Sequence, residues 1–140
     1  MKVLVLNSGS SSIKYQLFDM QGLTVLASGM VERIGENQGQ IIHKVMESSR
    51  GDGTIITKTL PVTDHRHGFE LMNQMLAETG VIRHSSELAG MGHRVVHGGE
   101  KFQTPVIITD DVMETIHTLV PLAPLHNPAN LTGIRVAREY

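Results

Sequence analysis

The sequence of 140 residues contains no cysteine and no tryptophan, and its only aromatic side chains besides histidine are three Phe and two Tyr. Without cysteine the chain can form no disulfide, thiol nucleophile or thiolate metal site. The scarcity of aromatic rings argues against a stacking platform for nucleic-acid bases. These absences exclude several classes of function before any motif is considered.

The sequence also lacks a strong charge of one sign and a long apolar run. The formal net charge is -2, so neither a basic nucleic-acid patch nor an acidic disordered tail is expected. No apolar run is long enough to cross a bilayer. The N-terminus lacks the layout of a signal peptide, because polar residues soon follow a short apolar run. The sequence therefore predicts a soluble cytoplasmic protein with no membrane or nucleic-acid partner.

The N-terminal part of the chain predicts five successive strands, which would form an antiparallel meander. Their ranges are residues 2–6, 11–17, 23–32, 40–46 and 54–60. Turn-forming residues separate the first strands at 7–10 and 19–22, and the last two at 51–53. In the second strand Ser12, Lys14 and Gln16 share one face, because side chains alternate along a strand.

The rest of the chain predicts three helices and one further strand. Asp64 caps the first helix, whose apolar residues recur at helical spacing until Gly80 ends it. A strand follows at 88–96, then a helix at 111–119 capped by Thr109 or Asp110. The last helix, 128–139, follows Asn127 as its cap and shows no C-terminal glycine or proline, which predicts a fragment of a longer protein. The order of elements indicates an α/β domain with a mixed sheet.

The first group of candidate functional residues is the polar turn after the first strand, 7–12, together with Lys14. Four serine hydroxyls, the Asn7 carboxamide, backbone N–H groups and one ammonium group suit a phosphate. The spacing is not that of a Walker P-loop, and a strand follows instead of a helix. An ordinary serine-rich hairpin turn would look the same.

The second group is 92–99, Gly-His-Arg-Val-Val-His-Gly-Gly. On a strand, four residues separate His93 and His97 by roughly 13 Å, too far to share one metal ion. Arg94 and Val96 share one strand face, where a guanidinium beside a branched side chain suits a small carboxylate with a short alkyl group. Alternatively, Arg94 pairs with a structural Asp or Glu.

The third group is 121–128, where two prolines predict an extended segment and a third starts a helix. His126 lies just before this helix, whose N-terminus favours anions. Its imidazole could donate to a phosphoryl or carboxylate oxygen. Equally, it could be a histidine packed in a proline-rich turn. The remaining histidines, such as His43 and His65, are interpreted as surface or satisfied residues, and the 130–132 sequon as unused.

The segments VLNSGSSSIK, GHRVVHGG and PLAPLHNPANLTGI resemble, in order, the three N-terminal signatures of the acetate kinase family. The resemblance implies a ribonuclease H-like fold of the superfamily of acetate and sugar kinases and actin-like ATPases. It implies two such domains with an active site between them, of which this chain is similar to the first. The second, carrying most of the nucleotide pocket, would lie beyond the chain, as would the family's essential aspartate and its magnesium-binding glutamate.

For the nucleotide side of the site, the resemblance implies roles for four residues. Asn7 matches an asparagine near the Mg²⁺ (or Mn²⁺). Ser10, Ser12 and Lys14 match residues that face the phosphates of ATP.

For the acyl side, the resemblance implies four more roles. Arg94 matches the arginine that binds the substrate carboxylate or acyl phosphate. Val96 and Leu125 match the small apolar pocket for its methyl group. His126 matches a histidine beside the transferring phosphoryl group, so that Arg94 and His126 are the expected catalytic residues.

The activity implied is phosphoryl transfer between ATP and acetate, giving acetyl phosphate and ADP, by a full-length enzyme expected to be a homodimer. Three alternatives remain: a propionate or butyrate kinase with the same machinery, a non-catalytic binding module on the same fold, and an actin-like ATPase. The expected site requires cationic groups from distant segments to meet in one hollow.

Overall fold

The computed structural model describes residues 1–46, 53–95, 104–122 and 127–138. Six strands form one sheet in the order β5-β4-β3-β2-β1-β6. All neighbours are antiparallel except β1 and β6, which run parallel. The predicted meander and mixed sheet are therefore confirmed. The strands are β1 (Lys2–Ser8), β2 (Ser12–Asp19), β3 (Thr24–Glu32), β4 (Gly39–Met46), β5 (Gly53–Leu60) and β6 (Leu88–His93).

Strand β1 is longer than the sequence pattern predicts. Asn7 and Ser8, expected in the turn, still pair with Lys14 and Ile13 of β2. Ser8 can remain in the strand because its buried hydroxyl and carbonyl both have hydrogen-bond partners, so that burying them carries little penalty. The turn is thereby reduced to residues 9–11, and the Gly9 N–H closes it by donating to the Ser12 carbonyl at 2.8 Å.

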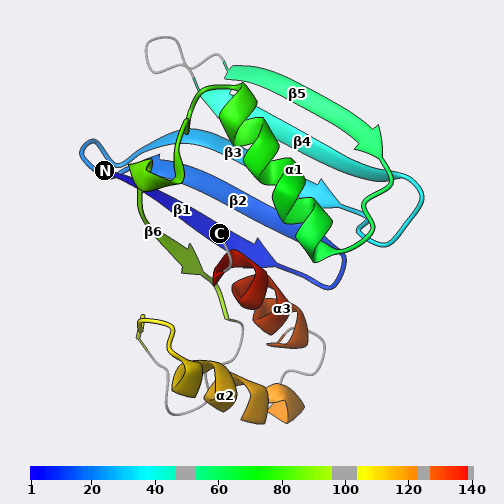
Figure 1. Cartoon of the computed structure of the whole chain (residues 1–140), viewed down its shortest axis with the longest axis vertical. Helices are drawn as coiled ribbons and strands as arrows, with labels where there is room; N and C mark the ends of the chain where they lie inside the picture. The colour runs from blue at the N-terminus through cyan, green and yellow to red at the C-terminus, as the bar shows by residue number, and fades with distance from the viewer. Residues whose placement is uncertain (47–52, 96–103, 123–126, 139–140) are drawn as a thin grey trace.

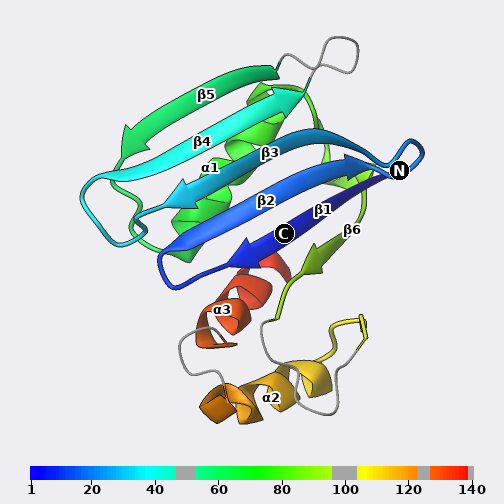
Figure 2. The same cartoon turned by 180° about the vertical axis from the view of Figure 1, so that it is seen from behind.

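Helix α1 (His65–Glu78) begins and ends where the sequence predicts. The Asp64 carboxylate accepts from the His67 N–H at 2.8 Å, and Gly80 follows the helix with a φ of 74°. The apolar face of α1 packs on β2, β3 and β4. Figures 1 and 2 show that α1 covers one face of the sheet and that none of the described helices covers the opposite face of these strands.

Two further helices lie beside the parallel edge of the sheet. The helix α2 (Asp110–Thr118) has Thr109 as its N-cap, and α3 (Asn127–Arg138) packs against β1, β6, α1 and α2 (Figure 1). A small second apolar cluster joins α2 to α3, formed by Met113, Ile116, Leu131 and Ile134. Helix α3 therefore connects the sheet to α2.

Three further predictions about the elements are wrong. Strand β6 ends at His93, and Arg94 and Val95 lie outside it. Pro121 lies in a short 3₁₀ turn, η2 (Val120–Leu122), instead of an extended segment. Its fixed φ is compatible with such a turn. Helix α3 already includes Asn127.

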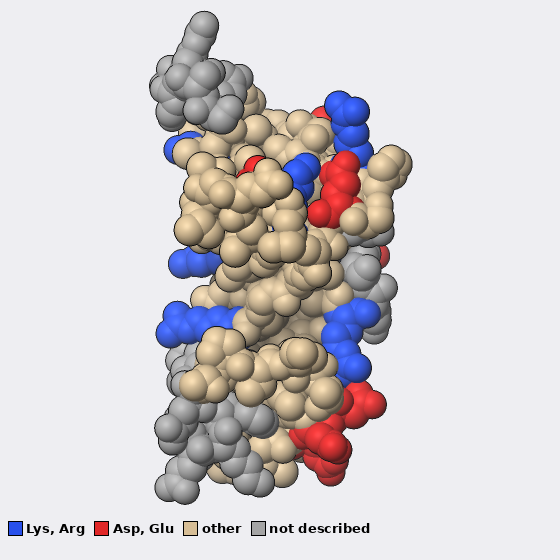
Figure 3. Space-filling model, turned by 90° about the vertical axis from the view of Figure 1, so that its left-hand side faces the viewer, with Lys and Arg blue, Asp and Glu red and all other residues tan. Residues whose placement is uncertain are grey.

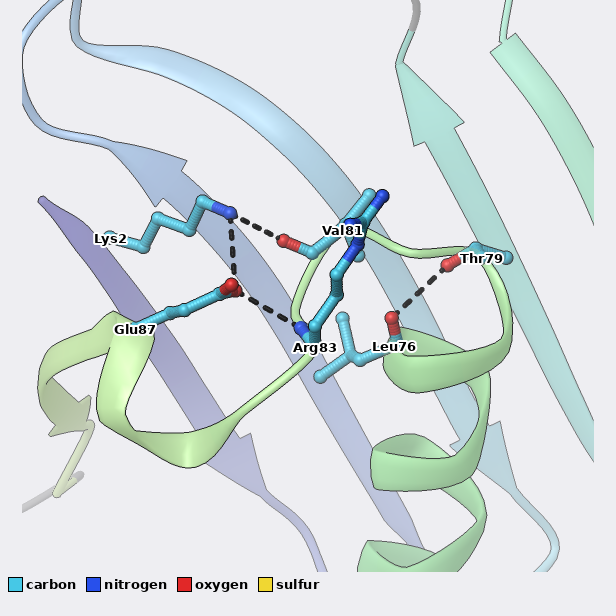
Figure 4. A network of polar contacts seen from close by, with 6 residues as sticks. All are labelled: Lys2, Leu76, Thr79, Val81, Arg83 and Glu87. Atoms are coloured by element: carbon cyan, nitrogen blue, oxygen red, sulfur yellow. Dashed lines mark hydrogen bonds and ion pairs between the residues drawn. The ribbon is translucent and has the colours of Figure 1, made fainter.

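A polar network places the start of β6 beside the start of β1. Figure 4 shows Lys2 directed at the segment that joins α1 to β6, with its ammonium group donating to the Val81 carbonyl at 2.7 Å and contacting Glu87 at 3.4 Å. Glu87 belongs to the 3₁₀ turn η1 (Ser85–Glu87) and also accepts from the Arg83 N–H at 3.0 Å. That hydrogen bond lowers the pKa of the Glu87 carboxyl. Lys2 thus lies opposite Leu88 at the beginning of the parallel pair.

Among the helices of the described residues, none is sufficiently long and apolar to cross a membrane.

Candidate active site at the ends of the parallel strands

The ends of β1 and β6 bring Lys14, Asn7 and Arg94 into one row across three adjacent segments, here called the site row. Asn7 lies opposite Lys14 in the register of β1 and β2. On the other side, His93 lies opposite Leu6, and the Arg94 N–H donates to the Leu6 carbonyl at 3.0 Å. Two interstrand spacings separate the Cα atoms of Lys14 and Arg94, roughly 10 Å.

Alternation along the strands places Asn7 and Lys14 on the face opposite α1. Their neighbours Leu6 and Tyr15 are buried in the core on the helix side. Asn7 and Lys14 also line the same cavity of about 440 Å³. The prediction that Ser12, Lys14 and Gln16 share the face opposite Ile13, Tyr15 and Leu17 is confirmed by their burial.

The two cations of the site row have no counter-ion within the described part of the chain. No described carboxylate forms an ion pair with the Lys14 ammonium or the Arg94 guanidinium, and both residues are exposed. The alternative in which Arg94 pairs with a structural carboxylate thus finds no support among these residues. An arginine without a counter-ion can bind a carboxylate or phosphate through two hydrogen bonds.

The turn beside the site row is held by its carbonyl groups. The Ser8 carbonyl accepts from the buried carboxamide of Asn130 at 2.9 Å. The Gly9 carbonyl is bound by the Nε2 atom of His65, the first residue of α1, at 2.7 Å. The N–H groups of Ser10 and Ser11 have no partner among the described residues, so they are available to an anion.

Behind the site row, Ser8, His93 and Arg94 are linked by hydrogen bonds. The Nδ1 atom of His93 lies 2.7 Å from the Arg94 carbonyl, and its Nε2 atom lies 3.1 Å from the Ser8 hydroxyl. A carbonyl oxygen can only accept, so Nδ1 carries the proton and Nε2 accepts from Ser8. Burial lowers the pKa of the His93 imidazole, while the hydrogen bond to the Arg94 carbonyl acts in the opposite direction.

Arg94 and Lys14 line different cavities of the described structure. The larger one, about 880 Å³, lies between β6, residues 104–108, α2 and α3, and Arg94 is among its lining residues. Figure 3, which faces this side of the molecule, shows a largely uncharged surface hollowed between its upper and lower parts. The expectation that both cations line one hollow is therefore not met by the described residues, although the backbone register places them in one row.

Three of the predicted site residues, Val96, Leu125 and His126, lie outside the described residues. Of the others, Asn7, Lys14 and Arg94 form the site row, and Ser10 and Ser12 belong to or adjoin the turn. Ser8, counted in the sequence among the ligand-facing hydroxyls, is only 1% exposed.

The structure adds His65, His93 and Asn130 to the neighbourhood of the site. The sequence alone indicates no partner for these residues, and Asn130 stands out there only as part of the 130–132 sequon. His93 and Asn130 do lie inside the segments that resemble the family signatures, which is the one sequence signal for them. Their contacts with Ser8 join residues far apart in the chain, and local patterns do not reveal such contacts.

Comparison with known proteins decides the family. Residues 2–140 match the Acetokinase family. The chain belongs to this family. An acetate kinase of Streptomyces avermitilis is 52% identical over 136 residues, which cover 97% of this chain and 33% of that protein.

Two solved kinase structures have the same fold as this chain. The acetate kinase of Porphyromonas gingivalis superposes with a TM-score of 0.87 at 39% identity, over 99% of this chain and 34% of that one. A propionate kinase of Francisella tularensis gives 0.86 at 35%, over 99% and 33%. These matches confirm the predicted fold class of an actin-like, ribonuclease H-like α/β domain. The chain spans about a third of the length of these relatives.

Proposed function

We propose that these 140 residues form the N-terminal domain of a longer acetate kinase, which transfers a phosphoryl group between ATP and acetate. The remaining two thirds of such an enzyme would supply a second domain with most of the nucleotide pocket. The observation that carries the proposal is the site row, in which Lys14 and Arg94 lie on either side of Asn7 without a described counter-ion. Membership of the acetokinase family supports it.

The reaction brings two anions together, so its barrier is largely electrostatic and orientational. An acetate oxygen forms a bond to the γ-phosphorus of ATP while the bond to the β–γ bridging oxygen breaks, and the products are acetyl phosphate and ADP. Arg94 binds and orients the carboxylate through two of its N–H donors. Lys14 neutralises charge on the transferred phosphate.

The turn completes the phosphate side of the proposed site. Its carbonyl groups are held by Asn130 and His65, which leaves the N–H groups of Ser10 and Ser11 as donors to phosphate oxygens. The hydroxyls of Ser10 and Ser12 have the same role. On the acyl side, Val96 and Leu125 would contact the methyl group and His126 would donate to the transferring phosphoryl group.

The residues at the site fit a magnesium ion that is held mainly by phosphate oxygens and water. Mg²⁺ prefers oxygen ligands and often has few from the protein. The Asn7 carboxamide can supply one oxygen, directly or through water, and no group of three or more His, Asp or Glu side chains suited to a metal occurs among the described residues. Mn²⁺ would fit equally. The ion would supply positive charge to the transferred phosphate.

A propionate kinase is the second candidate, favoured by the likeness to the Francisella tularensis enzyme. Acetate and propionate differ by one methylene, which a pocket distinguishes by only about 1–3 kcal/mol. Overlapping activities are therefore expected. The full-length enzyme is also proposed to be a homodimer through its remaining part.

The test is an assay of the full-length enzyme with ATP, Mg²⁺ and acetate, propionate or butyrate, with hydroxylamine to trap the acyl phosphate. We expect hydroxamate with acetate at the highest kcat/KM and with propionate at a lower one. Hydrolysis of ATP that is independent of any carboxylate would instead indicate an actin-like ATPase. ATP binding without either reaction would indicate a non-catalytic module.

A further inference from the structure

The Arg94 backbone is held on both sides while its side chain has no described ion-pair partner. Its N–H donates to the Leu6 carbonyl at 3.0 Å, and its carbonyl accepts from the His93 imidazole at 2.7 Å. Arg94 lies directly after the end of β6, and the pairing of β6 with β1 ends at His93. The imidazole therefore holds the carbonyl of a residue whose side chain has no ion-pair partner among the described residues.

His93 is itself fixed by two neighbouring segments. Its Nε2 atom accepts from the Ser8 hydroxyl at 3.1 Å, and the carbonyl of Ser8 is bound by Asn130 of α3 at 2.9 Å. Gly133 of α3 packs so closely that a Cβ there would lie 2.6 Å from Nε2. The ring therefore has little freedom to rotate away from the Arg94 carbonyl.

The hydrogen bond between the Ser8 hydroxyl and His93 Nε2 is like that between a catalytic serine and its general base. Ser8, however, is only 1% exposed and is covered by α3. A substrate cannot reach such a hydroxyl. The ring's other nitrogen is directed at the backbone of Arg94 and not at an orienting carboxylate. The arrangement therefore serves to hold a neighbouring residue in place.

We propose that His93 is a positioning residue, which fixes the backbone of Arg94 and thereby the place from which the guanidinium binds the substrate carboxylate. This inference rests on the proposed function. It requires the neutral imidazole with its proton on Nδ1, because the opposite tautomer would direct a lone pair at the Arg94 carbonyl and a proton at the Ser8 hydroxyl.

Two substitutions in the full-length enzyme separate positioning from general stability. In His93→Asn, the carboxamide can place its N–H₂ near the former Nδ1 and retain the donor to Arg94. In His93→Gln, the carboxamide reaches the position of Nε2 and loses that donor. We expect His93→Gln to raise the KM for acetate roughly ten- to hundredfold with little change in the KM for ATP, and His93→Asn to restore most of the loss.

Thermal unfolding of both variants provides the control for stability. If the two variants lose activity equally, or lose affinity for ATP and acetate in parallel with a lower Tm, the positioning role is wrong. If either variant unfolds, Ser8→Ala takes its place in the comparison. This substitution removes the hydroxyl that donates to His93 Nε2. It should raise the KM for acetate and not that for ATP, and by less than His93→Gln does.

A spectroscopic measurement keeps this inference separate from the proposed function. Long-range ¹H–¹⁵N correlation spectra of the 140-residue chain, labelled at histidine, should show His93 with its proton on Nδ1, and a spectrum of the other tautomer would overturn the inference. If the wild-type enzyme forms no acyl phosphate, the proposed function is wrong. If His93 nevertheless carries its proton on Nδ1, the anchoring of the Arg94 backbone by His93 remains supported.

Discussion

Arg94 is the residue whose surroundings point most directly to a ligand, because its backbone is fixed and its guanidinium is not paired with a described carboxylate. We expect Arg94→Ala in the full-length enzyme to lower kcat/KM for acetate by about 10²–10³, through lost stabilisation of the transition-state charge. Arg94→Lys should recover little, because a lysine cannot form the two parallel hydrogen bonds.

Hydroxamate formation at varied acetate concentration measures the effect of the Arg94 variants. Arg135→Ala is the matched control, since Arg135 is exposed on α3 and lines neither of the two cavities described above. Near-normal turnover by Arg94→Ala would show that the carboxylate is bound elsewhere.

His43 is a residue of the core and not of the site. Its side chain is 0% exposed, and its Nδ1 atom lies 2.6 Å from the Tyr15 hydroxyl and its Nε2 atom 3.2 Å from the Thr79 hydroxyl. Thr79 donates to the Met75 carbonyl, so it can accept from Nε2–H, and Nδ1 then accepts from Tyr15. This network needs a neutral imidazole. Burial accordingly lowers the pKa of His43 and raises that of Tyr15.

The lowered pKa of His43 predicts that stability falls in acid. Between its folded-state pKa and the ordinary value of 6.5, the unfolded chain binds a proton that the folded chain does not. The free energy of unfolding should therefore fall as the pH drops below about 6.5 and be insensitive to His43 above it. Urea unfolding of the 140-residue chain at several pH values measures this slope.

His43→Leu should flatten that slope, at a cost of about 1–3 kcal/mol, because it leaves the buried Tyr15 hydroxyl without a partner. Tyr15→Phe combined with His43→Leu should recover part of the loss. His117→Gln, at an exposed position on α2, is the control that should keep the slope of the original chain. An unchanged slope in His43→Leu would assign the acid sensitivity to another group.

At the scale of the elements, the contact of α3 with the ends of β1 and β6 decides the geometry behind the site row. Gly133 lies at this contact, where a Cβ would overlap the Ser8 hydroxyl. Alanine favours a helix over glycine by about 1 kcal/mol. Here we expect Gly133→Ala to destabilise the fold by about 1–3 kcal/mol nevertheless, since α3 must move away from the strands.

The matched control for Gly133→Ala is Gly90→Ala in β6, where no heavy atom lies within 4 Å of the added Cβ. The midpoint of urea unfolding should stay close to that of the original chain in Gly90→Ala and fall in Gly133→Ala. Equal midpoints would mean that the packing between α3 and the strands is looser than the contact distances indicate.

The same elements show what could be predicted from the sequence. The alternation in β2, the capping by Asp64 and the cap at Thr109 are local patterns, and each predicted element is present. The continuation of β1 through Ser8 is different. It depends on contacts of Ser8 with His93 and Asn130, which lie 85 and 122 residues away in the chain. Sequence patterns carry no information on such contacts.

Contacts between residues distant in the chain also explain which site residues could be predicted from the sequence and which could not. Lys14, Asn7 and Arg94 were identified by their chemistry and by resemblance to a family, since each has a side chain suited to an anion or a metal. The residues that hold the turn and the Arg94 backbone, which are His65, Asn130 and His93, have ordinary side chains whose role follows only from their contacts. The family resemblance alone assigned them no role.

At the scale of the whole molecule, Asn7 and Lys14 of the site row lie on the sheet face opposite α1, and none of the described helices covers that face (Figure 2). Stabilisation of charge in a transition state is strong only where water is largely excluded, and Lys14 and Arg94 are both exposed. We therefore expect the 140-residue chain by itself to form no acyl phosphate above background with ATP, Mg²⁺ and acetate.

The hydroxamate assay of the 140-residue chain and of the full-length enzyme, at equal molar concentration, tests this expectation. Circular dichroism and a cooperative urea transition of the short chain control for its folding, so that inactivity is not a result of unfolding. A folded short chain with turnover within about tenfold of the full-length enzyme would show that Lys14, Arg94 and the serine turn suffice for the reaction. The second domain would then serve only to raise affinity for the nucleotide, and not to enclose the transferred phosphate.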